Sequence, residues 1–255
     1  MSKIEILIMG LTIHYTLSLN SATIEEVRAK IMTIRNIALK FPLVQVGGLV
    51  ELAGEDCIFK PKEHNNPNTY LKLRALKMVG LTEEEENDPN NYYGINPKYL
   101  IAFDTLPGPG SESATFGLAT YEEIEERNDW SLGGFCKTQY ASNPEYGGLE
   151  NFIRCHKFIV EMLDEIQKLG ISCEVQDEGE YWESRNLDDL MGNLQQYNFF
   201  VAALVGTFKN QSNQEVNIIE APVLKYPNFE YLEAEGNDLL KEKLQELNDL
   251  KREQE

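Results

Sequence analysis

An alternating segment near the N-terminus, LTIHYTLSL at residues 11–19, constrains the fold more than any other feature. Its apolar side chains alternate with polar ones, and His14 shares the polar face with two threonines and a serine. Because side chains of a strand point alternately to its two faces, this period predicts a strand with one buried face. The polar face is then either solvated or the floor of a pocket.

A helix and a second strand are expected directly after this segment. Thr23 and Glu26 have the spacing of a capping box, which satisfies backbone N–H groups at a helix start. Apolar residues then recur at helical spacing until Pro42, which cannot continue a helix. Residues 43–52 read as a strand, so the sequence predicts a β-α-β unit.

A similar order of signals recurs later in the chain. Two strand-like runs joined by a Pro/Gly turn come first, followed by a strand, an amphipathic helix ending at Gly170 and another strand. The corresponding ranges are 98–106, 113–121, 130–141, 149–169 and 171–179. A long helix should follow from about Asn186, and its second half is apolar nearly all round, which predicts burial.

These elements predict an α+β fold with ferredoxin-like β-α-β units, in which helices cover one face of a mixed sheet. The two halves span roughly residues 10–52 and 98–208, with an irregular insertion at 53–97. We expect a single α+β domain over residues 1–228. The charged, leucine-edged segment 229–255 predicts a C-terminal amphipathic helix.

Charge limits the classes of partner. The chain has 255 residues and a formal net charge of −19, which disfavours nucleic acid and anionic membrane and favours a basic protein partner. The N-terminus lacks the pattern of a signal peptide, and no apolar run reaches the ~18 residues of a membrane helix. Four cysteines without a C-x-x-C pair are expected to be reduced thiols, so we predict a cytoplasmic protein.

Three segments resemble a group of uncharacterised bacterial proteins. They are GSESATFGLATY at 110–121, FCKTQYASNPEYGGLENFIRCH at 135–156 and DEGEYWESRN at 177–186. The resemblance covers roughly residues 100–208. It implies a bacterial, cytoplasmic setting and assigns neither an activity nor a catalytic residue.

A thiol enzyme is one hypothesis, with Cys136, Cys155 and His156 as candidates. Such an enzyme needs a nucleophilic thiolate beside a base. Neighbours on a helix point about 100° apart, so Cys155 and His156 cannot easily hold one metal ion together. A nucleophile pair would need Cys136 or Cys173 to approach His156 across the interface between helix and sheet. His156 also falls on the apolar stripe of its helix, which favours a buried, hydrogen-bonded histidine.

An acidic cluster gives two further hypotheses. Glu178 and Glu180 could share a hard cation with Asp104, although the spacing matches no metal-binding motif and we predict neither metal nor cofactor. Alternatively, Tyr181 and Trp182 could form the aromatic centre of a protein interface that the two glutamates surround.

For function, the charge favours a non-catalytic acidic binding protein for a protein partner. An immunity-type protein that neutralises a basic toxin would suit it. One alternative is a small-ligand-binding protein with a pocket over the polar sheet face, lined by His14, Lys137 and Gln139. The other is a hydrolase, using either a thiol or a carboxylate–metal centre. Whether the protein is an enzyme, and its oligomeric state, stay open at this point.

Overall fold

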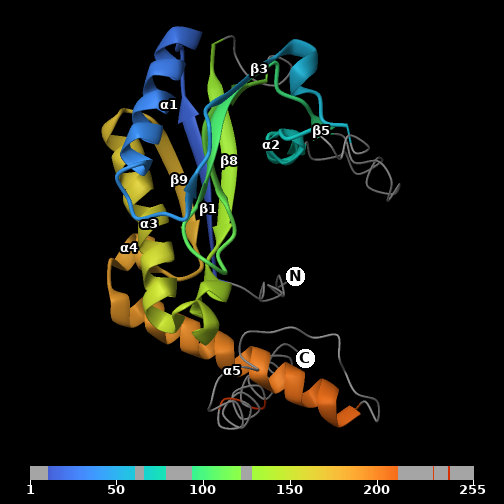
Figure 1. Ribbon diagram of the computed structural model, residues 1–255, viewed down its shortest axis with the longest axis vertical. Helices are drawn as coiled ribbons and strands as arrows, with labels where there is room; N and C mark the ends of the chain where they lie inside the picture. Colours follow the sequence, from blue (N-terminus) through green and yellow to red (C-terminus); the bar gives the residue numbers. More distant parts are fainter. Residues whose placement is uncertain are drawn as a thin grey trace, which may run out of the picture.

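The computed structural model describes residues 11–60, 66–78, 94–121 and 128–211, together with Leu232 and Lys241 (Figure 1). Side chains of the last helix are described as far as residue 203. The predicted C-terminal helix at 229–255 therefore lies almost wholly outside the described residues.

The described residues form one large sheet and one small one. The large sheet has seven strands in the order β2-β6-β7-β8-β1-β9, with β3 also pairing with β6. The small sheet pairs β4 with β5. The strands are β1 (Thr12–Leu19), β2 (Gln45–Val46), β3 (Val50–Ala53), β4 (Lys77–Met78), β5 (Gly94–Ile95), β6 (Tyr99–Leu106), β7 (Ala114–Thr120), β8 (Trp130–Lys137) and β9 (Ser172–Asp177).

Paired strands run antiparallel throughout the described sheet. The α+β class is confirmed, whereas the expected mixed sheet is a mostly antiparallel one. Because β8 and β9 both pair antiparallel with β1, they run parallel to each other on its two sides. Helix α3 (Gly148–Lys168) connects them. Antiparallel neighbours need only short turns, but this pair of parallel strands needs the long crossover that α3 provides.

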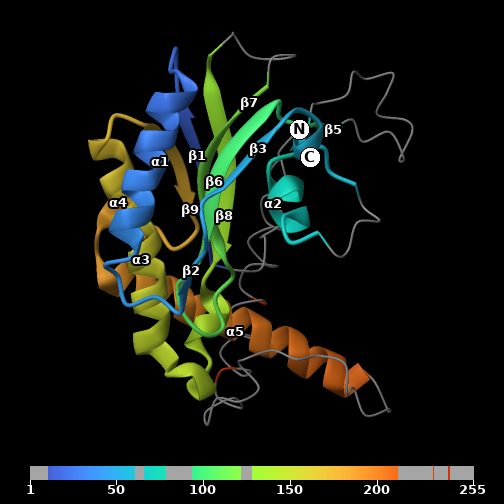
Figure 2. The same ribbon diagram turned by 45° about the horizontal axis from the view of Figure 1, so that its top comes forward.

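Helices α1 (Ile24–Ala38) and α3 cover one face of the large sheet, here called the inner face (Figure 2). The predicted capping box starts α1, since the Thr23 N–H donates to Glu26 Oε2 at 2.8 Å and the Glu26 N–H donates to Thr23 Oγ1 at 3.3 Å. Apolar residues at helical spacing then face the sheet, where they are fully buried: Val27, Ile31, Ile34 and Ala38.

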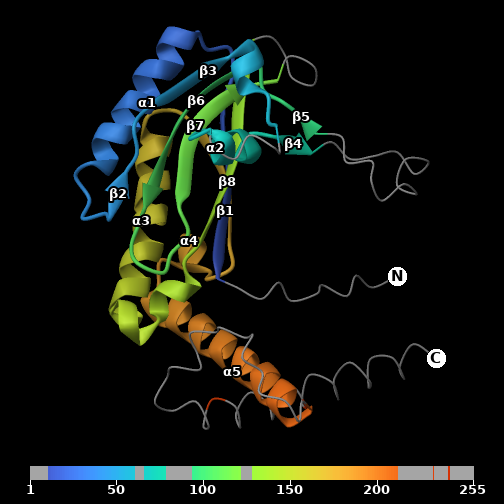
Figure 3. The same ribbon diagram turned by 45° about the vertical axis from the view of Figure 1, so that its right-hand side comes forward.

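The opposite, outer face is covered over only part of its width. The short helix α2 (Thr69–Arg74) and the β4–β5 pair lie against it (Figure 3). Leu71 packs there with Leu100 and Ala102, while the alternate residues Ile101 and Phe103 belong to the inner core. The expectation of helices on one face therefore misses α2, which comes from the insertion at 53–97.

The chain after β9 is helical. A single turn, α4 (Tyr181–Ser184), precedes α5 (Leu187–Gln211), which extends past the sheet (Figure 1). The described part of α5 buries the set Leu190, Leu194, Asn198, Phe199, Ala202 and Ala203, in line with the predicted burial as far as residue 203. Short 3₁₀ turns complete the described structure at Gly54–Cys57, Gln139–Ser142 and Pro144–Tyr146. Within the described residues, the length and apolarity that a membrane-crossing helix requires are not found.

Candidate functional site

A groove of about 480 Å³ lies on the outer face, beside α2 and over β8, β1 and β9. The strand register explains its composition: His14 lies opposite Phe135 on one side and Gln176 on the other, and Thr16 likewise lies between Gly133 and Glu174. Paired residues of an antiparallel sheet share a face. The lining residues are His14, Tyr15, Thr16, Arg74, Gly133, Gly134, Phe135, Glu174, Val175 and Gln176.

The polar face predicted for residues 11–19 thus forms the floor of a groove, and His14 lines it as an exposed side chain. Lys137 and Gln139, the other two predicted ligand residues, are not among its lining residues. Strand β8 ends at Lys137, whose ammonium lies 5.2 Å from the centre of the Tyr140 ring. Gln139 belongs to the following 3₁₀ turn and is buried, because the alternation of a strand stops where the strand ends.

Arg74, at the end of α2, forms the side wall of the groove. Its guanidinium lies between two aromatic rings, with the central carbon 4.3 Å from the Phe135 ring centre and 4.7 Å from that of Tyr70. Nη1 donates to the Phe135 carbonyl at 2.9 Å, and Nη2 donates to the Ser113 carbonyl at 3.0 Å and to the Tyr70 hydroxyl at 2.6 Å. No local sequence pattern identifies this residue, since α2 has only six residues, too few to show a period, and lies beside the groove only through tertiary packing.

Two adjacent glycines, Gly133 and Gly134, form part of the floor with opposite surroundings. A Cβ atom added to Gly133 would have no heavy atom within 4 Å. One added to Gly134 would lie 2.4–2.8 Å from ring atoms and the hydroxyl of Tyr15. That ring is fixed, because it stacks on Phe116 at 5.6 Å and its hydroxyl donates to the Thr115 carbonyl at 2.8 Å. Gly134 therefore lets the inner core approach the strand, and Gly133 leaves the groove open.

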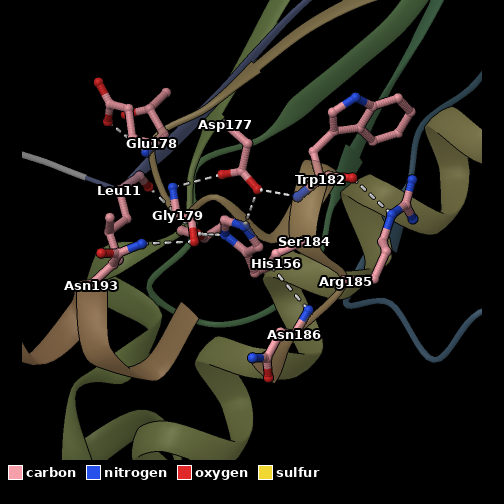
Figure 4. A network of polar contacts seen from close by, with 12 residues as sticks. Leu11, His156, Asp177, Glu178, Gly179, Trp182, Ser184, Arg185, Asn186 and Asn193 are labelled. Atoms are coloured by element: carbon pink, nitrogen blue, oxygen red, sulfur yellow. Dashed lines mark hydrogen bonds and ion pairs between the residues drawn. The ribbon is translucent and has the colours of Figure 1, made fainter. Parts of the chain in front are cut away.

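A second polar cluster is buried beneath the sheet, around His156 (Figure 4). The predicted burial of this histidine is confirmed, with both its side chain and that of Asp177 fully inaccessible. His156 Nε2 lies 3.1 Å from Asp177 Oδ2, and Nδ1 lies 2.9 Å from the Thr138 hydroxyl. The Asp177 carboxylate also accepts the backbone N–H groups of Gly179 and Trp182, each at 2.8 Å.

Figure 4 shows how this carboxylate joins the end of β9 to α4. Burial alone would raise the pKa of Asp177, but the bonds from His156 and from the two backbone N–H groups outweigh it and lower that pKa. These hydrogen bonds therefore favour the ionised carboxylate. The cluster fixes the β9–α4 turn and places no group in the groove.

The Asp177 network predicts a pH dependence of stability. A carboxylate whose folded pKa lies below its unfolded value of about 3.9 stabilises the fold above that value, and the contribution is lost as pH falls through the folded pKa. In urea unfolding, the stability gap between the native protein and Asp177→Asn should therefore shrink as the pH falls below about 4. A gap that widens below this pH would contradict the assignment.

The thiol candidates do not form a reactive pair in the described structure. His156 has no ring nitrogen left for a thiol, because Nδ1 bonds to the Thr138 hydroxyl and Nε2 to the Asp177 carboxylate. The Cys136 thiol instead donates to the Glu112 carbonyl at 3.3 Å. Burial raises the pKa of Cys136 and of Cys155 above the ordinary thiol value. Both thiols therefore stay protonated near neutral pH, whereas the nucleophile would be a thiolate.

The acidic candidates are separated by the sheet. Asp104 is on β6 and Glu178 follows β9, and β7, β8 and β1 lie between these strands. Four strand spacings of about 4.8 Å place them roughly 19 Å apart, too far to share a cation. Glu178 instead accepts the Thr12 N–H at 2.8 Å, and Glu180 is exposed with a left-handed φ of 58°. Among the described residues, no group of three or more potential metal ligands comes together.

The aromatic candidates belong to the fold. Tyr181 is only 9% exposed and its ring lies 6.2 Å from that of His156. Trp182 is half-buried and packs against the inner core. Its outer side is covered by Arg185, whose guanidinium lies 4.6 Å from the indole centre and pairs with Asp164 at 2.7 and 2.9 Å. Neither ring is an open anchor for a protein partner.

The chain matches no family model, no curated protein and no solved structure. The resemblance of residues 110–121, 135–156 and 177–186 to a group of uncharacterised bacterial proteins therefore stays a prediction.

Proposed function

We propose that the protein is a non-catalytic binding protein that takes a small molecule in the groove on the outer sheet face. The observation that carries the proposal is the groove of about 480 Å³, whose wall is an arginine held by three hydrogen bonds and two aromatic rings. Concave sites of this size with a few fixed polar groups are typical of small-molecule binding. We also propose that the two β-α-β units are ferredoxin-like, which the position of β1 between β8 and β9 supports.

Binding has more support than catalysis at this site. The described lining contains neither cysteine nor serine, and the buried His156 lies on the opposite side of the sheet from the groove. A basic protein partner on the acidic surface, which the charge alone favoured, has less support, because Tyr181 and Trp182 are engaged within the fold. Hot-spot residues of an interface need to be accessible before binding.

Substitution of Gly133 by valine should abolish ligand binding without unfolding the protein. The new side chain would enter open space on the groove floor, and β-branched residues suit a strand. Amide chemical shifts of Gly133, Gly134 and His14 should respond to members of a fragment library containing neutral, cationic and anionic compounds. In Gly133→Val the responses of the Gly134 and His14 amides should disappear.

The matched control is Gly48→Val, since a Cβ at Gly48 also meets nothing within 4 Å and Gly48 is not among the groove lining. This variant should bind fragments as the native protein does. If no fragment perturbs the groove amides, or if Gly133→Val binds as well as the native protein, the groove is not a ligand site.

A further inference from the structure

We infer that the groove selects a monoanionic carboxylate carried on a small planar group, with Arg74 as the anchor. This inference rests on the proposed binding function and adds the chemical class of the ligand. It starts from the partners of Arg74: within the described residues, this arginine makes no ion pair with a carboxylate. In a chain of net charge −19, a fixed arginine without such a partner is an unusual local site for an anion.

The donor inventory of Arg74 leaves capacity for a ligand. A guanidinium has five N–H donors, and three are used on Phe135, Ser113 and Tyr70. Nε is buried and has no hydrogen-bond partner. One N–H of Nη1 therefore remains for an acceptor. The two flanking rings hold the guanidinium in place before binding, so little side-chain entropy is lost when the acceptor arrives.

The other groups of the groove decide the charge of the ligand. Glu174 lines the same groove, so a second negative charge on the ligand would be repelled. A phosphate monoester carries about −1.5 to −2 at pH 7, whereas a carboxylate carries −1. Arg74 and Glu174 together therefore favour the carboxylate.

The planar group follows from the aromatic wall and the open floor. Phe135 is 38% exposed, and the His14 ring lies 6.0 Å from it at an interplanar angle of 35°. These two rings border the space above Gly133 that no side chain fills. An aromatic acid could place its ring against Phe135 at an offset or edge-on angle while its carboxylate meets Arg74. Thr16 and Gln176 line the same groove and offer hydrogen bonds to polar substituents.

Three probes that share a phenyl ring test the inference by isothermal titration and by amide chemical shifts: benzoate, benzamide and phenyl phosphate. Benzoate should bind with a Kd on the order of 1 mM, as expected for so small a ligand. Benzamide, which has the shape without the charge, should bind about tenfold more weakly, and phenyl phosphate should also bind more weakly than benzoate. Gly133 and His14 amides should shift.

Variants of the native chain provide the second arm. Arg74→Gln should weaken benzoate about tenfold and leave benzamide unchanged, and Arg74→Lys should fall between Arg74→Gln and the native protein. Lys40→Gln, which removes the same charge from an exposed position outside the groove lining, should leave benzoate affinity within about twofold. If Arg74→Gln does not fold, the comparison of the three probes on the native protein still decides.

The outcomes separate the inference from the proposed function. Benzamide binding in the groove as tightly as benzoate, or an unchanged benzoate affinity in Arg74→Gln, would keep the groove as a ligand site but overturn the anionic class. Phenyl phosphate binding more tightly than benzoate would overturn the carboxylate. Absence of groove shifts with every fragment and probe would refute the binding function itself.

Discussion

Asp177→Ala is expected to lower the free energy of unfolding by about 3–5 kcal/mol, the largest effect of any single substitution considered. The change removes the buried partner of His156 and, with it, the acceptor of the Gly179 and Trp182 N–H groups. Each buried donor left without an acceptor costs about 1–3 kcal/mol. Urea unfolding followed by circular dichroism measures the loss directly.

The control is Glu183→Ala, an exposed carboxylate in α4, which should change stability by no more than about 0.5 kcal/mol. A loss below about 1 kcal/mol in Asp177→Ala would show that the cluster does not hold the β9–α4 turn. Asp177→Asn keeps the shape and some acceptor capacity, so its loss should be smaller than that of alanine.

The second large effect is expected at Gly134. Gly134→Ala should destabilise the protein by about 1–3 kcal/mol, because the new methyl group would overlap the fixed ring of Tyr15. The adjacent Gly133→Ala is its matched control and should be neutral or slightly stabilising, since alanine restricts the unfolded chain and meets open space. Thermal unfolding of the two variants should separate them clearly. Equal melting temperatures would mean that Tyr15 moves aside at little cost.

Both of these predictions concern the inner face of the sheet. On the inner face, Tyr15 and the Asp177 network are held by apolar packing and buried hydrogen bonds, so changes there affect the fold. On the outer face, Gly133 and His14 border open space, so changes there affect binding first. A stability assay therefore tests the packing of the inner face, and a binding assay tests the groove on the outer face.

The amino-acid sequence by itself was sufficient for the local elements. The alternation at residues 11–19 identified β1 and both of its faces, and the Thr23–Glu26 pair identified the start of α1. The apolar stripe that contains His156 predicted its burial. These signals are local: the period of side chains in a strand or helix and the bonding of a helix end depend on residues within a few positions of one another.

Only the tertiary structure decided which distant residues meet. The sequence pattern allowed a cation site shared by Asp104 and Glu178, but the strand order places three strands between them. His156 bonds to Asp177 and Thr138 rather than to a thiol. Arg74, on a short helix of the insertion, donates a hydrogen bond to the Phe135 carbonyl of β8. Pairing order and the packing of a six-residue helix depend on contacts between segments far apart in the chain, and no local period in the sequence encodes them.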